Sequence, residues 1–270
     1  GSASKSLTGH SQIVGGNFGN LAEIKSMFKF YNIPDIDTTE KIIGNSPSIK
    51  FSSAFDLNDP FELKFILNVD PNSEEEKIEF FKNFPDKTFA DFSEWQNQVD
   101  EQFIWYNQQK QRDRFAQTIT LSCFTESHQN NLMWSHYTYN HHGICVEYCE
   151  ELFKYFQSLD IFLAYGKIKY SDEPPTLQNF ESLESKVEKI FFNKQSEWEY
   201  EKEHRVILQS KKRTDFIPID NKLIKAVYIG SKCDSNMCKK IIELCNSSGI
   251  DIFHGITFGS NTYKVQFKKH

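Results

Sequence analysis

The sequence lacks several features that would assign it to a class at once. No apolar run approaches the roughly 18–20 residues that span a bilayer, so we expect no membrane-spanning helix and no membrane partner. No secretory signal peptide is recognised, and we therefore expect a cytoplasmic protein. Neither a Gly-x-Gly-x-x-Gly run nor a Walker loop occurs, which excludes the common glycine-rich loops that bind phosphates.

The chain also lacks an excess of positive charge. It has 31 basic and 37 acidic side chains, a net charge of −6, which disfavours broad electrostatic binding to nucleic acid. A local basic patch is still allowed, and short basic runs occur at 211–213 and 268–269. Six cysteines without an export signal indicate reduced, mostly buried thiols, and we expect no structural metal.

Aromatic residues are abundant, with 25 Phe in 270 residues, which favours an aromatic-rich core. Short β-like runs mix with helical patterns and predict an α+β fold with a mostly antiparallel mixed sheet. We divide the chain into a flexible N-terminal segment, 1–20, and a single domain, 21–270. Within this domain, 73–116 has aromatics at helical spacing and is predicted to be a helical insertion, broken at Pro85.

The stretch from Thr118 to Glu147 is rich in polar aromatic groups. Two β-like runs flank a segment for which we predict a short helix, Asn131 to Tyr137, with Trp134 inward and His136 at a rim. Strand ends that present such groups often build sites, so His136 is a candidate catalytic residue. The same histidine is equally well explained as a hydrogen-bonding residue of the interior.

A second run, Ser196 to Leu208, has glutamates at four alternate positions: Glu197, Glu199, Glu201 and Glu203. In an extended chain all four lie on one face, where their repulsion requires solvent or cations such as Arg205. A solvated helix end that enters a strand explains the run as well. Paired carboxylates at a strand start also suit enzymes that position a sugar hydroxyl and a nucleophile, so Glu201 and Glu203 are candidate catalytic residues.

The segment from Asn58 to Glu62 has two interpretations. Asn58-Asp59-Pro60 is ordinary turn chemistry with side-chain capping. It is also suited to a polar loop beside a site, in which Asn58 or Asp59 binds a ligand hydroxyl or amide.

Four segments resemble a bacterial family known as domain-of-unknown-function family 2971, in the family's order along nearly the whole chain. The run from Met133 to Tyr137, followed by His142-Gly143, is the most specific part. The segments are Phe28–Tyr31, Phe51–Glu62, Leu121–Glu126 continuing to Leu132–Glu147, and Trp198–Arg205.

The chain is also similar, more weakly, to the ADP-ribosyltransferases, whose late strand opens with a catalytic Glu, often as Glu-x-Glu. The resemblance implies a split sheet with Glu201 and Glu203 as this late pair. It places the hydroxyl strand at Ser52 and Ser53, and the first motif at Lys29 to Tyr31. That first motif has neither the Arg nor the His-x-Thr that is usual in the family.

This resemblance implies an enzyme that uses NAD as a substrate, for ADP-ribosyl transfer or for hydrolysis. Glu203 would stabilise the charge on the ribose, and Glu201 would orient or deprotonate the acceptor, which is a protein or a nucleic acid. A nucleotide would stack on Trp134 or Tyr31, and Asn58 or His136 would hold its diphosphate or amide. The other binding residues implied are Lys29, Ser52, Asp59, Tyr137 and Arg205. We expect a role in bacterial phage defence or as a toxin, since such families tend to be used in this way.

Two other functions fit the same residues. A magnesium-dependent nuclease or other hydrolase would gather Asp59, Glu62, Glu201 and Glu203 around the metal. A non-enzymatic binding module, such as a toxin-neutralising partner or a phage-defence sensor, would bury the tryptophan, the histidine and the glutamates without an open cleft. The sequence leaves the oligomeric state open.

Overall fold

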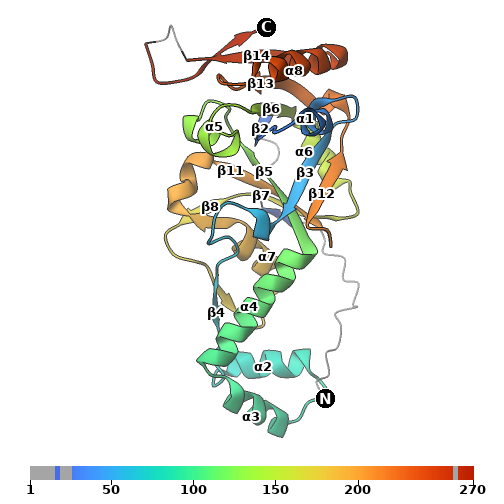
Figure 1. Ribbon diagram of the computed structural model, residues 1–270. Coiled ribbons are helices and arrows are strands. Elements are labelled where there is room, and N and C mark those ends of the chain that lie inside the picture. The colour runs from blue at the N-terminus through green and yellow to red at the C-terminus, as the bar shows by residue number, and fades with distance from the viewer. Residues whose placement is uncertain (1–15, 19–25, 258–260) are drawn as a thin grey trace.

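The structure is a computed structural model that describes residues 16–18, 26–257 and 261–270 (Figure 1). The predicted flexible segment, 1–20, lies outside these residues except for the short strand β1. The described strands are β1 (Gly16–Phe18), β2 (Ser26–Tyr31), β3 (Ser48–Ser53), β4 (Ile66–Asn68), β5 (Ile119–Thr125), β6 (Ile144–Cys149), β7 (Phe162–Lys167), β8 (Lys169–Ser171), β9 (Thr176–Gln178), β10 (Asn193–Gln195), β11 (Glu203–Gln209), β12 (Thr214–Pro218), β13 (Ile224–Ile229), β14 (Asp251–Ile256) and β15 (Gln266–Lys269).

The described α-helices are α1 (Ile36–Ile43), α2 (Glu74–Asn83), α3 (Phe89–Gln98), α4 (Glu101–Thr118), α5 (Asn131–Tyr137), α6 (Glu151–Gln157), α7 (Leu183–Phe191) and α8 (Ser235–Ser248). Short 3₁₀ turns η2 (Ala54–Asp56), η3 (Ser196–Glu201) and η4 (Asn221–Leu223) connect them. The predicted helix from Asn131 to Tyr137 is confirmed, and its N-cap Asn130 accepts from the backbone of Leu132. No described helix combines the length and the apolar character that crossing a membrane requires.

Eleven strands form one mostly antiparallel mixed sheet, in the order β1-β7-β11-β5-β2-β6-β13-β14-β15, with β3 and β12 attached beside β5. Parallel pairing occurs in this sheet between β1 and β7 and between β13 and β14. The predicted α+β class is therefore confirmed. Two small two-stranded sheets, β10-β8 and β4-β9, lie outside the main one.

The main sheet divides at β5. One edge of β5 pairs with β11 along its whole length, from Ile119 to Thr125. The other edge is shared, because β3 pairs only with Thr120 and Leu121 and β2 only with Thr125. These pairings leave a notch opposite Cys123, in the middle of the strand.

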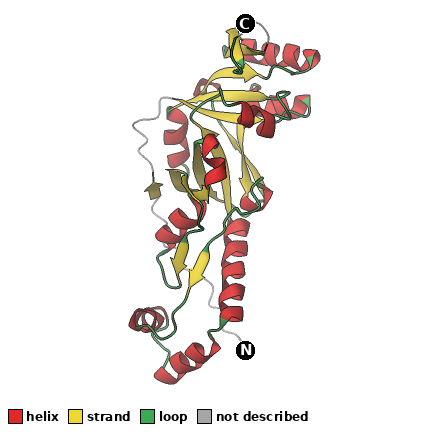
Figure 2. Cartoon of the chain, turned by 90° about the vertical axis from the view of Figure 1, so that its left-hand side faces the viewer, coloured by secondary structure: helices red, strands yellow, loops and turns green. Residues whose placement is uncertain are grey.

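Helices cover both faces of the sheet (Figure 2). One core joins the sheet to α1, α6 and α8 through buried residues such as Ile43, Phe156 and Ile241. A second core lies on the opposite face against α7 and the end of α4, and it includes Leu121 and Phe191. A third, smaller cluster is built around Trp134.

The stretch predicted as a helical insertion holds α2, α3 and most of α4, which extend away from the sheet as a helical arm, residues 74–118 (Figure 1). Each helix begins at a side-chain cap, and Thr88 and Asp91 form a full capping box at α3. Phe80, Phe92 and Trp95 contact one another inside the arm. Residues outside the arm also contact it, since Phe180 packs against Phe84 and Trp95.

Candidate active site

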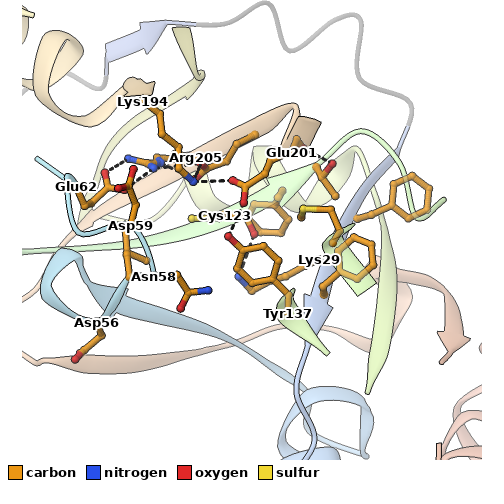
Figure 3. A pocket seen from close by; sticks show the side chains of 17 residues that line it. Lys29, Asp56, Asn58, Asp59, Glu62, Cys123, Tyr137, Lys194, Glu201 and Arg205 are labelled. Carbon is orange, nitrogen blue, oxygen red and sulfur yellow. Dashed lines mark hydrogen bonds and ion pairs between the residues drawn. The ribbon is translucent and has the colours of Figure 1, made fainter. Parts of the chain in front are cut away.

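A pocket of about 210 Å³ opens at the notch in the sheet (Figure 3). It lies where β2, the loop after β3, β5, α5, β10 and β11 meet. Its lining residues are Phe28, Lys29, Phe30, Asp56, Leu57, Asn58, Asp59, Glu62, Cys123, Phe124, Thr125, Met133, Tyr137, Lys194, Glu201, Glu203 and Arg205. The segment around α5 and the late glutamates thus converge on one pocket, although about seventy residues separate them in the sequence.

Arg205 forms the centre of a buried ion network at the back of the pocket. Its guanidinium binds both oxygens of Glu62, at 2.5 and 3.0 Å, and both oxygens of Glu203, at 2.6 and 3.2 Å. A further N–H donates to the Phe191 carbonyl at 2.9 Å. A guanidinium with two bidentate partners is held in one orientation, so Glu62 and Glu203 are fixed as well.

Lys194 connects the two candidate catalytic glutamates. Its ammonium lies 2.6 Å from Glu201 and 3.1 Å from Glu203, and its position over the Trp198 ring adds a cation–π contact. The Tyr137 hydroxyl donates to the other Glu201 oxygen at 2.5 Å. α5 therefore contributes Tyr137 to the site, directly against Glu201.

The two glutamates differ in their proton affinity. Burial raises the pKa of Glu201 above its ordinary value, and the nearby charge of Glu203 raises it further, against the opposing effect of Lys194. Burial would also raise the pKa of Glu203, but the charges of Arg205 and Lys194 outweigh it and lower that pKa well below the ordinary value of 4.5. Neighbouring carboxylates with such opposite environments are typical of acid–base sites.

Lys29 enters the notch from β2. Its ammonium donates to the Cys123 carbonyl at 3.0 Å and lies over the rings of Tyr31 and Phe124. Burial lowers the pKa of Lys29, which makes it the least strongly protonated cation of the pocket. Burial also raises the pKa of the Cys123 thiol, so Cys123 is not a thiolate nucleophile at neutral pH.

Of the two conformations considered for 197–203, the extended run does not occur, and a helical turn that leads into a strand does. Residues 196–201 form the 3₁₀ turn η3, and Lys202 takes a left-handed conformation (φ 44°) before β11 begins. The change of direction at Lys202 turns Glu201 and Glu203 into the pocket, while Glu197 and Glu199 are outside its lining. The four glutamates do not share a face, because a 3₁₀ turn lacks the two-residue repeat of a strand.

Several predicted binding residues lie outside the pocket. Trp134 is fully buried, packs edge-on against Phe30, and donates its indole N–H to the His128 carbonyl at 2.6 Å. Tyr31 is buried in the core, with its hydroxyl 2.8 Å from that of Tyr148. In this structure neither ring has a free face in the pocket on which a nucleotide could stack.

His136 and Ser52 are also outside the pocket lining. His136 is exposed on α5, and its ring nitrogen lies 2.9 Å from the Tyr200 hydroxyl. Ser52 pairs within the sheet, opposite Leu121 on β5. His136 therefore helps to fix η3 against α5 rather than facing the pocket.

The loop after β3 forms one wall of the pocket. Asp59 is buried and accepts from the backbone N–H of Phe61 at 2.8 Å, which is the predicted turn capping. Asn58 is exposed and also lines the pocket (Figure 3). The predicted capped turn is therefore confirmed and lies beside the pocket, while ligand binding by Asn58 or Asp59 stays a prediction.

The magnesium hypothesis conflicts with these contacts. The oxygens of Glu62 and Glu203 accept hydrogen bonds from Arg205, and those of Glu201 accept from Lys194 and Tyr137. Across the described ranges, no three His, Cys, Asp or Glu side chains are grouped to hold a metal ion. A cation at this position would first have to displace buried lysine and arginine groups.

Sequence reasoning missed Lys194 as a member of the site. It lies on a short strand, β10, in a stretch that carries no local motif. Glu62 was considered only as a metal ligand, although it closes the network around Arg205. A buried arginine needs an anionic partner and acceptors for its five N–H donors, and Glu62 supplies two of these acceptors.

Comparison with protein families identifies the segment that contains this network. Residues 133–206 match the model of a family described as protein of unknown function (DUF2971). The resemblance to this family that the sequence predicts is therefore confirmed over residues 133–206. The DUF2971 segment includes Tyr137, Lys194, Glu201, Glu203 and Arg205, so it supplies most of the polar groups of the pocket. Comparisons with curated proteins and with solved structures gave no match.

Proposed function

We propose that this pocket is the active site of an NAD-consuming enzyme, which transfers ADP-ribose to an acceptor or hydrolyses NAD. The observation that carries the proposal is the buried pair Glu201 and Glu203, held at one pocket by Lys194 with opposite proton affinities. Two carboxylates with separate roles suit cleavage of a glycosidic bond, whose transition state carries positive charge on the sugar.

Glu203 is the charge-stabilising group in this proposal. Breaking the bond between nicotinamide and ribose develops positive charge at C1′ of the ribose. Glu203 keeps its negative charge at neutral pH, because Arg205 and Lys194 lower its pKa. A carboxylate fixed beforehand stabilises that charge without having to reorient during the reaction.

Glu201 is the proton-accepting group. Its raised pKa brings it closer to neutrality, where a carboxylate is an effective base. Tyr137 and Lys194 orient its two oxygens, so it is positioned to accept the proton of an attacking water or acceptor hydroxyl. A proton transfer of this kind contributes on the order of 10²–10⁴ in rate.

The size of the pocket limits which part of the substrate enters. Its volume of about 210 Å³ falls below the roughly 300–1,000 Å³ of pockets that enclose whole ligands of drug size. The nicotinamide riboside end would therefore occupy the pocket and the adenylate end would lie outside. Exposed Asn58 at the loop after β3 is suited to a hydrogen bond with the substrate.

The test combines thermal shift with NAD, with and without magnesium, and nicotinamide release. We expect NAD alone to raise the melting temperature and to be cleaved. Glu203→Gln should lower the cleavage rate by about 10²–10³, as the loss of one transition-state contact typically does. Glu126→Gln is the matched control, since Glu126 pairs with Lys167 and His204 outside the pocket lining. No shift with NAD, or equal rates in both variants, would refute the proposal.

A non-catalytic binding module is the second candidate, favoured by the fact that Arg205 already occupies both oxygens of Glu203. It predicts an NAD-induced thermal shift without nicotinamide release. As part of the main proposal, we place the protein in bacterial phage defence or among toxins. Expression of the wild-type chain should then arrest growth, and Glu201→Gln should relieve the arrest.

A further inference from the structure

Charge is distributed very unevenly along the chain. The C-terminal lobe, defined as residues 222–270, has eight lysines and three acidic residues, whereas residues 1–221 have 23 basic and 34 acidic residues. Three of the eight lysines, Lys225, Lys240 and Lys269, form ion pairs. The other five are exposed and form no ion pair with the described residues; they are Lys222, Lys232, Lys239, Lys264 and Lys268. An acidic protein thus has one basic end, which attracts polyanions.

A second cavity, of about 490 Å³, lies between this lobe and residues 128–129. Its aromatic lining comprises His128, Tyr228, Phe253 and Phe267, and its polar lining includes Lys264 and Gln266. The His128 and Tyr228 rings stack at 4.0 Å, and the Tyr228 and Phe253 rings stack at 4.9 Å. Tyr228 already stacks on both neighbours, so a planar base would stack on a remaining face of His128 or Phe253.

The cavity lies on the face of β13 and β14 that α8 leaves open. Ile241 and Cys245 of α8 pack with Ile252 in the core on the opposite face. The aromatic face of β14 carries Phe253, with the Lys269 ammonium 6.0 Å from its ring centre. Cations therefore lie beside the aromatic rings, as required where phosphates and bases bind together.

Phe28 connects the second cavity to the active-site pocket. It lines the pocket and lies 5.1 Å from the His128 ring and 6.0 Å from the Tyr228 ring, both of which line the second cavity. A ligand in the second cavity is thus one side chain away from the pocket.

We propose that the C-terminal lobe binds single-stranded nucleic acid, with one base stacked in the second cavity and the phosphates near Lys264 and Lys269. The strand would present a neighbouring nucleotide to the active-site pocket as the acceptor. This acceptor role rests on the proposed NAD chemistry, whereas strand binding does not. A single strand fits better than a duplex, because paired bases do not expose the faces that stack on aromatic rings.

The transfer step balances without a further reagent. The bond from ribose C1′ to nicotinamide breaks, and its electron pair leaves with nicotinamide. A nucleophilic nitrogen or oxygen of the nucleotide forms the new bond to C1′ and loses its proton. Glu201 accepts this proton and later releases it to water.

Fluorescence anisotropy with a labelled 12-nucleotide single strand and with a 12-base-pair duplex tests the binding. We expect the single strand to bind more tightly and to weaken as salt increases. Phe253→Leu, which keeps an apolar side chain but removes the stacking ring, should weaken binding at least about fivefold. Lys264→Glu should also weaken binding and reduce its dependence on salt.

Lys212→Glu is the control, because Lys212 is an exposed lysine of the basic run 211–213, outside the C-terminal lobe, and pairs with Asp215. Equal weakening by Lys212→Glu, tighter binding of the duplex, or binding only to phosphatidylserine vesicles would overturn the proposal. Nicotinamide release by the wild-type protein, measured beside strand binding, separates the two proposals. Normal release in a wild-type protein that does not bind the strand refutes only this inference, while strand binding without any release refutes only the NAD chemistry and the acceptor role.

Discussion

The helical arm and the active-site pocket both pair acidic with basic side chains, but in different surroundings. On the arm, Lys82 contacts Glu79 at 2.8 Å, and the lysine side chain is 69% exposed. In the pocket, Arg205 contacts Glu62 and Glu203 with a side chain that is 0% exposed. Water screens the first pair and is excluded from the second. Breaking the buried ion pair should therefore change the free energy of unfolding more than breaking the exposed one. The exposed ion pairs of the arm contribute little to stability, whereas the buried pairs of the pocket fix the positions of its side chains.

The largest expected effect comes from removing the buried cation. Arg205→Met should destabilise the protein by about 3–5 kcal/mol, because Glu62 and Glu203 would stay buried without their partner. Urea denaturation measures this change. A loss below about 1 kcal/mol would mean that water enters the pocket and screens the network.

The next largest effect is expected when acid protonates Glu203, which should lower the free energy of unfolding. The folded-state pKa of Glu203 is lowered, so its stabilising contribution is present above the ordinary value of 4.5 and is lost as the pH falls below it. The free energy of unfolding of the wild type should therefore decrease between about pH 4.5 and about pH 3. Glu203→Gln should show a flatter acid limb in the same urea series. The raised pKa of Glu201 acts in the opposite sense, since its contribution decreases as the pH rises above 4.5.

A helix cap on the arm should have a smaller effect. Thr88→Ala removes the side chain that accepts from the Asp91 backbone N–H at the start of α3. The loss should be about 1 kcal/mol, the usual value for an N-cap, and hydrogen exchange should locate it in the arm. Thr88→Ser is the control, because it keeps the hydroxyl. Equal destabilisation by both variants would contradict a capping role.

The smallest effect is expected for an exposed pair on the arm. Lys82→Met should change the free energy of unfolding by less than about 0.5 kcal/mol, because the pair with Glu79 is screened by water. Thermal unfolding at low and high salt measures it. A change comparable to that of Arg205→Met would remove the distinction between the two regions.

Prediction from the sequence was most accurate where a local pattern decides the structure. The helix from Asn131 to Tyr137 was predicted correctly, because Asn130 caps it and its apolar residues recur at helical spacing. Trp134 was correctly predicted to face inward. The conformation of 197–203 was left open between an extended run and a helix end that enters a strand, because alternating glutamates have a strand-like repeat whether or not the chain is extended. The left-handed Lys202 has no sequence signal comparable to a glycine.

The sequence by itself determined the α+β class, the short helix α5 and the prominence of Glu201 and Glu203, since each follows from local spacing and side-chain chemistry. Only the tertiary structure decided which groups meet at the notch beside β5. It placed Tyr137 and Lys194 on Glu201, and moved Trp134 and Tyr31 into the core. The reason is physical: a buried charge must be paired, and its partners are chosen by packing between distant segments, which no local pattern records.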